Sequence, residues 1–123
     1  MSRKIRTRTP DTNPPNTTEM AQFVRSHLST GDLLAQLAEE AAELAQAALK
    51  LRRAYEGTNP TPISIKEATE ALREEYADIR LCLKVADVLG SPVETYDIMD
   101  RKLARWCGRL REAGGAAHGK DGL

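Results

Sequence analysis

The sequence predicts an all-α protein with a four-helix-bundle-like fold. Apolar residues recur at steps of three and four along most of the chain, which is the period of an amphipathic helix. Residues that cap helices stand where these apolar patterns begin. The 123 residues include only one Phe, one Trp and three Tyr, so the core of this single domain must be aliphatic.

The first two helices are expected in the N-terminal half of the chain. Thr17 or Thr18 can cap the first helix, which has Glu19 near its positive end and apolar residues at Met20, Phe23, Val24 and Leu28. The second helix is expected over about 31–54. Its predicted apolar stripe consists of Leu33, Leu34, Leu37, Ala41, Leu44, Ala48 and Leu51.

Capping boxes predict the starts of the last two helices. Ser64 with Glu67 opens the third helix, and Ser91 with Glu94 opens the fourth after Gly90 ends the third. The predicted inner stripe of the third helix is Ile65, Ala68, Leu72, Tyr76, Ile79, Leu83 and Ala86. From Leu81 to Leu89 apolar residues lie around almost the whole circumference of that helix, which predicts burial against a second subunit.

The two ends of the chain are too polar to join the core. We expect a disordered basic arm over 1–16, a folded domain over 17–112 and a disordered tail over 113–123. The formal net charge is zero and argues neither for nor against nucleic-acid binding. The basic cluster of the arm is more typical of a solvated tail, so nucleic acid is not an expected partner. There is no long apolar run and no signal-peptide pattern, so the prediction is a soluble, cytoplasmic protein that does not bind membranes. Cys82 and Cys107 are expected to be buried free thiols.

The second and third helices each carry a group of acidic residues. Glu39, Glu40 and Glu43 form an E-E-x-x-E run, and Glu75 and Asp78 form an E-x-x-D pair. Residues three and four apart share a helix face, so each helix presents paired carboxylates at the edge of its apolar stripe. Such runs on alanine-rich helices are also common as solvated faces, and the combination of the two carries the argument.

The connection between these helices predicts that the acidic groups meet. From Glu43 to the end of its helix, and from the next helix start to Glu75, the distance is roughly 16 Å at 1.5 Å per residue. An antiparallel hairpin closed by the turn at 55–63 would therefore bring Glu43 and Glu75 level. Two carboxylates about 5 Å apart repel by about 3 kcal/mol at an effective dielectric near 20. Carboxylates without His or Cys suit Mg²⁺, or Mn²⁺ in its place.

Basic residues on the fourth helix could complete a polyphosphate site. Lys102, Arg105 and Arg109 follow one another at steps of three and four. Such residues are usually solvated, but Lys102 and Arg105 could reach the acidic groups and contact phosphates. Acidic pairs and a nearby basic stripe together describe a site for a Mg²⁺-bound polyphosphate.

These motifs resemble those of the MazG-like all-α nucleoside triphosphate pyrophosphohydrolases. The likeness extends from about 32 to 110 and includes the segments 37–44, 74–79 and 102–106. One departure is the 31 residues between Glu43 and Glu75, more than is usual in compact members of the family.

The resemblance implies hydrolysis of an NTP or dNTP between the α and β phosphates, in nucleotide-pool house-cleaning. It implies that Glu40, Glu43, Glu75 and Asp78 hold Mg²⁺. Glu39, or one of those ligands, would orient or deprotonate the attacking water, and Lys102 and Arg105 would contact phosphates. It also implies a homodimer or homotetramer. The preferred base and sugar, the number of ions and the identity of the general base stay open.

Two other classes of function share parts of this pattern. A non-catalytic helical oligomerisation or adaptor module would use the apolar segment 81–89 and leave the acids solvated. A di-iron carboxylate bundle is disfavoured, because neither His27 nor His118 follows a glutamate by three residues, as that class of site requires.

Overall fold

The computed structural model describes residues 14–60 and 62–121, with side chains described as far as 114. Within these residues the chain is all-helical, as predicted, with four α-helices and no strand. They are α1 (Thr17–His27), α2 (Thr30–Glu56), α3 (Ile65–Ala86) and α4 (Pro92–Asp121). The chain divides into two compact units, Met1–Val88 with α1 to α3, and Leu89–Leu123 with α4. Most of the predicted basic arm lies outside the described residues.

Reciprocal side-chain bonds start the first three helices. At α1 the cap is Asn16, not Thr17 or Thr18: the Glu19 amide donates to Asn16 Oδ1 at 2.8 Å, and the Asn16 amide donates to Glu19 Oε1 at 2.9 Å. Ser29 and Asp32 make the same box at α2. The predicted box of Ser64 and Glu67 is confirmed at α3. Each box satisfies backbone amides that have no partner within the helix.

The ends of α3 and α4 differ from the prediction. α3 stops at Ala86, because Asp87 adopts the left-handed conformation (φ 50°) and takes the chain out of the helix before Gly90. Ser91 Oγ accepts from the Val93 amide at 3.2 Å, where the sequence predicted a box with Glu94. The α4 backbone continues to Asp121, through the segment 113–121 expected to be a tail.

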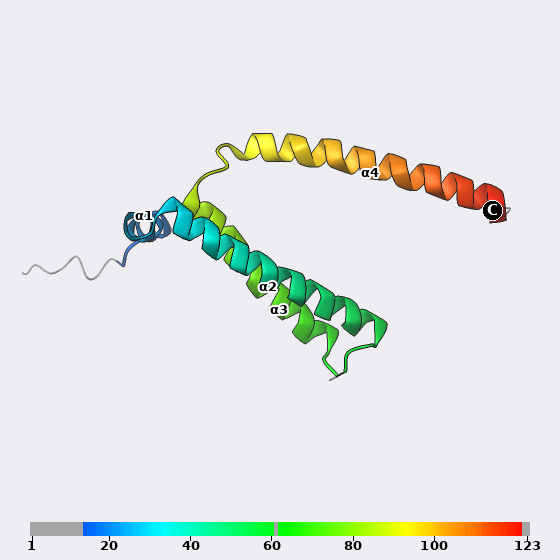
Figure 1. Cartoon of the computed structure of the whole chain (residues 1–123), viewed down its shortest axis with the longest axis horizontal. Helices are drawn as coiled ribbons and strands as arrows, with labels where there is room; N and C mark the ends of the chain where they lie inside the picture. The colour runs from blue at the N-terminus through cyan, green and yellow to red at the C-terminus, as the bar shows by residue number, and fades with distance from the viewer. Residues whose placement is uncertain (1–13, 61, 122–123) are drawn as a thin grey trace, which may run out of the picture. The chain divides into compact units, whose positions relative to one another are not determined.

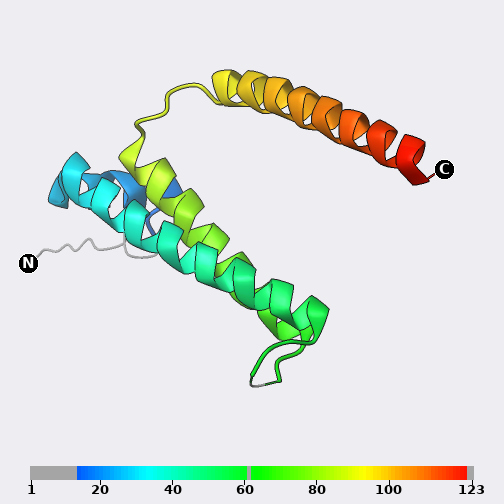
Figure 2. The same ribbon diagram turned by 45° about the vertical axis from the view of Figure 1, so that its right-hand side comes forward.

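The seam between α2 and α3 is the main packing contact of the first unit. The two helices lie side by side in an antiparallel hairpin (Figures 1 and 2). Residues that are at least partly buried recur at steps of three and four, the period with which two helices interlock. On α2 this row is Leu33, Leu37, Glu40, Leu44, Ala47, Leu51 and Ala54, and on α3 it is Ala68, Leu72, Glu75, Ile79, Cys82 and Ala86.

This seam corrects both predicted stripes. Leu34, Ala41 and Ala48 on α2, and Tyr76 on α3, are exposed. The true rows pass instead through two acidic positions, Glu40 and Glu75. Charged residues therefore occupy places where an apolar side chain would pack, and both are partly withdrawn from water.

A small core forms where α2 begins and α3 ends. Leu33, Val85 and Ala86 are buried there, and Ala21 of α1 packs against them. Arg25 of α1 fixes the crossing, because its Nε donates to the Val85 carbonyl at 2.8 Å and its guanidinium lies 3.6 Å from Asp87.

The apolar segment 81–89 is only partly explained by this core. Val85 and Ala86 are buried within the chain itself, whereas Leu81, Val88 and Leu89 are exposed. The second-subunit contact predicted for this segment stays a prediction. Among the helices described, none is long and apolar enough to span a bilayer.

Candidate metal-binding site

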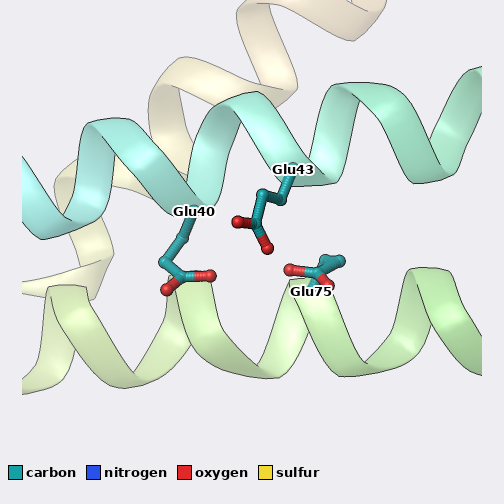
Figure 3. A group of neighbouring side chains, drawn as sticks. All are labelled: Glu40, Glu43 and Glu75. Carbon is teal, nitrogen blue, oxygen red and sulfur yellow. The ribbon is translucent and has the colours of Figure 1, made fainter.

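Three acidic side chains from two helices converge on one point of the α2–α3 seam. Glu40 and Glu43 extend from successive turns of α2, and Glu75 faces them from α3 (Figure 3). One carboxylate oxygen from each lies within 4.8 Å of the others. The antiparallel hairpin brings these carboxylates together, because the middle of α2 lies level with the middle of α3.

Local packing makes the position of Glu75 unfavourable for a bare carboxylate. Glu75 belongs to the seam row of α3 and Glu40 to that of α2, so both are partly withdrawn from water. Glu75 Oε2 is buried, and the described residues provide no hydrogen-bond partner for it. Native proteins satisfy about nine in ten buried polar atoms, and an exception calls for a missing partner such as an ion or water.

The electrostatics of the cluster point the same way. Burial raises the pKa of the Glu75 carboxyl, and the negative charges of Glu43, Asp78 and Glu40 raise that pKa further. The close approach of the Glu43 carboxyl also favours the protonated form, and so adds to the rise in pKa. Burial and the neighbouring carboxylates both disfavour an ionised Glu75 that has no positive partner. A cation at this point would reverse the balance, because it attracts all three carboxylates at once.

The donor set fits a hard divalent cation. Mg²⁺ binds oxygen ligands at about 2.1 Å in octahedral geometry, which sets neighbouring ligands roughly 3 Å apart and opposite ligands roughly 4.2 Å apart. Oxygens within 4.8 Å of one another would move closer together to reach that spacing around a bound ion. Mn²⁺ prefers similar oxygen ligands, and the cluster contains no histidine or thiolate that would favour a softer metal.

The remaining acidic residues singled out by sequence lie beside this cluster. Asp78 is exposed one turn after Glu75, near enough for its charge to raise the pKa of Glu75. Within the described residues the three-carboxylate group does not include it, so its role as a fourth ligand stays a prediction. Glu39 is exposed on α2 next to Glu40 and is likewise outside the group.

The two predicted phosphate contacts lie on α4, in the second unit. Lys102 and Arg105 line an open hollow on the surface of that helix together with Trp106 and Arg109. Their predicted approach to the carboxylates stays a prediction. Trp106 and Arg109 were not assigned to the site, although their spacing from Lys102 by four and seven residues places them on the same face.

Two neighbours of the carboxylates were missed by sequence reasoning. Gln36 Nε2 donates to Glu40 Oε2 at 2.7 Å and holds that side chain one turn along α2, a contact that the i, i+4 spacing could have indicated. Cys82 lies one turn after Asp78; burial raises the pKa of its thiol first, and the charges of Glu40 and Asp78 raise it further. Cys82 and Cys107 are free, as predicted, but half-buried.

Comparison with known proteins adds nothing to this geometry. No family model, no curated protein and no solved structure matches the chain. The resemblance of the two acidic motifs to the MazG-like enzymes therefore stays a prediction.

Proposed function

We propose that the protein is a Mg²⁺-dependent nucleoside triphosphate pyrophosphohydrolase that produces a monophosphate and pyrophosphate. The observation that carries the proposal is the meeting of Glu40, Glu43 and Glu75 across the α2–α3 seam, with a buried and unpartnered oxygen on Glu75. A helical hairpin built only for stability would have apolar residues such as leucine at the seam positions of Glu40 and Glu75. A divalent cation would relieve the repulsion among three carboxylates held together there, and nucleotide triphosphates bind Mg²⁺.

Each acidic residue has a distinct part in the proposed reaction. Glu40, Glu43 and Glu75 would hold the ion. Gln36, which donates to Glu40 Oε2, restrains the Glu40 side chain. Asp78, one turn from Glu75, completes the acidic side of the site. Glu39, or one of the ligands such as Glu40 or Glu43, would orient the attacking water or accept its proton. Bound Mg²⁺ supplies neutralisation of the phosphate oxygens and acidifies a bound water. Lys102 and Arg105 would contact the phosphates, as the motif resemblance implies.

The bond cleaved follows from the motif resemblance alone. The MazG-like enzymes attack between the α and β phosphates, and the E-E-x-x-E and E-x-x-D motifs are the support for that choice. A carboxylate-bound Mg²⁺ serves attack at other phosphorus atoms equally well. The identity of the products therefore decides this part of the proposal.

The experiment incubates the purified full chain with a panel of NTPs and dNTPs, with Mg²⁺, with Mn²⁺ and with EDTA. Ion-exchange chromatography separates nucleoside monophosphate from diphosphate. Metal-dependent release of monophosphate and pyrophosphate is expected. Diphosphate with orthophosphate would contradict the proposed bond, and turnover that persists in EDTA would contradict the role of the metal.

A second candidate is a non-catalytic helical association module. It is favoured by the row Tyr96, Met99, Leu103 and Leu110 on α4, whose members are all more than half exposed. Their spacing of three, four and seven residues is that of a helix that packs against another. This candidate predicts no turnover on any nucleotide and no dependence of stability on divalent ions.

A further inference from the structure

A basic and aromatic face on α4 has no role in holding the metal. Lys102, Arg105, Trp106 and Arg109 line an open hollow of about 420 Å³. At about 100° per residue these four positions fall within about 100° of the helix circumference, so they form one face. The Trp106 side chain is 62% exposed, which is high for the residue type with the largest apolar surface.

No ion pair among the described side chains neutralises the charge on this face. Among the residues whose side chains are described, Lys102, Arg105 and Arg109 take part in no ion pair. Arg105 and Arg109 stand four residues apart, a spacing at which like charges repel along a helix. A bound anion would relieve that repulsion. The face is therefore complementary to a ligand that carries several negative charges close together.

The exposed ring of Trp106 favours a ligand that has an aromatic group as well as phosphates. It lies at the border between the basic face and the apolar row of Tyr96, Met99, Leu103 and Leu110, with its ring accessible. Aromatic rings beside cationic side chains bind nucleobases by stacking, while the cations contact the attached phosphates. An inorganic polyphosphate would use the cations and leave the ring without a partner.

We propose that this face of α4 is a mononucleotide platform, in which Trp106 stacks on the nucleobase and Lys102, Arg105 and Arg109 bind the phosphates. The cations extend over seven residues, about 10 Å of helix, which suits one triphosphate. Single-strand binding surfaces follow the backbone over about four or more nucleotides and need a longer basic track. The choice of a triphosphate as ligand rests on the proposed function; the pairing of base with Trp106 does not.

Trp106 is the single tryptophan of the chain, so its fluorescence reports on this face alone. The full chain in EDTA, where the proposed hydrolysis cannot proceed, is titrated with a nucleoside triphosphate, with inorganic tripolyphosphate and with the uncharged nucleoside. We expect saturable quenching by the nucleotide and binding at least about tenfold tighter than that of tripolyphosphate, the order of one base–aromatic stack. Equal affinity for nucleotide and tripolyphosphate, or no quenching, would overturn the platform. So would an octanucleotide that binds more than tenfold tighter than the mononucleotide.

Variants separate the ring from the charges, with calorimetry as the readout. Trp106→Leu is expected to bind the nucleotide about tenfold more weakly and tripolyphosphate unchanged, while Trp106→Phe keeps most of the preference. Arg109→Gln should lower the affinity for both the nucleotide and tripolyphosphate. Arg111→Gln removes the same charge from an exposed position outside the hollow and should change neither. Circular dichroism checks that each variant keeps its helices. An unchanged nucleotide affinity in Trp106→Leu would refute the stacking role.

The platform and the hydrolase can fail separately. Glu43→Gln is expected to abolish turnover but to keep the quenching of Trp106. Hydrolysis without quenching would remove the platform and leave the proposed reaction standing. Quenching without hydrolysis by the unmodified chain would contradict the proposed reaction and leave the platform standing.

Discussion

Glu75 is the residue on which the site depends most. It occupies a seam position of α3, with one oxygen buried and unpartnered and with two other carboxylates opposite. Burial and the neighbouring charges raise its pKa above the ordinary 4.5. The metal-free protein therefore carries a local conflict that protonation or a cation would relieve.

The raised pKa of Glu75 predicts how metal-free stability depends on pH. As the pH falls through the raised pKa towards 4.5, the folded protein takes up a proton at Glu75 while the unfolded chain is still ionised there. Folding therefore gains stability as the pH falls through that window, and loses it as the pH rises. Thermal unfolding in EDTA should show that the unmodified chain becomes more stable as the pH falls through this window. The gain in stability should be smaller for Glu75→Gln. Glu74→Gln, an exposed neighbour, is the control; an identical pH profile in all three would contradict the account.

Substitution of the ligands should separate activity from stability. Glu43→Gln or Asp78→Asn should abolish turnover, because each removes a charge that would hold the proposed ion. Without metal, each variant should be as stable as the unmodified chain or slightly more stable, because local repulsion falls. Turnover assays and thermal unfolding in EDTA check both parts. Full activity in both variants would remove these residues from the site.

At the scale of elements, the seam explains which predictions succeeded. The box of Ser64 and Glu67 marked the start of α3 correctly, because the pattern is local and both partners lie in one turn. The start of α1 was misplaced, because Asn16, Thr17 and Thr18 are all capable caps. Part of each predicted stripe was misplaced, because the true rows pass through Glu40 and Glu75, two charged positions that an apolar pattern leaves out. Functional residues are where such local rules are expected to fail.

Close packing of α2 against α3 predicts a strong effect at Ala68. This side chain is fully buried in the seam, and a larger residue would force the helices apart. Ala68→Leu should lower the free energy of unfolding by about 1–3 kcal/mol, the usual effect of overpacking. Ala77→Leu makes the same change at an exposed position of α3 and should have little effect. Denaturant unfolding measures both, and equal effects would show that the seam is not tightly packed.

For the whole molecule, the described part of the chain buries few residues. Leu33, Ala68, Val85 and Ala86 are the buried apolar residues there, whereas many large apolar side chains are exposed. Exposed apolar rows of this kind usually mark surfaces that associate. The amino-acid pattern predicted association, but it assigned the contact to 81–89. The sequence did not assign the row on α4 to a contact between subunits, because one sequence does not reveal what a helix packs against.

Association through α4 is testable by a single charge. Leu103 is 63% exposed in the middle of the α4 row, and Leu103→Asp places a carboxylate there. If the predicted homodimer or homotetramer uses this row, the variant should dissociate to smaller species, as measured by light scattering after gel filtration. Ala104→Asp adds the same charge on a different bearing and should leave the assembly intact. A monomeric unmodified chain would contradict the predicted oligomer.

Direct binding of Mn²⁺ to the metal-free chain, followed by electron paramagnetic resonance, tests the central claim most closely. The free-ion signal reports how much Mn²⁺ is unbound, and no nucleotide is needed. Saturable binding is predicted for the unmodified chain and for Glu74→Gln, with at least about a tenfold loss of affinity in Glu75→Gln, because one of three charged ligands is gone. Equal binding by all three proteins, or none by the unmodified chain, would mean that Glu40, Glu43 and Glu75 do not hold an ion.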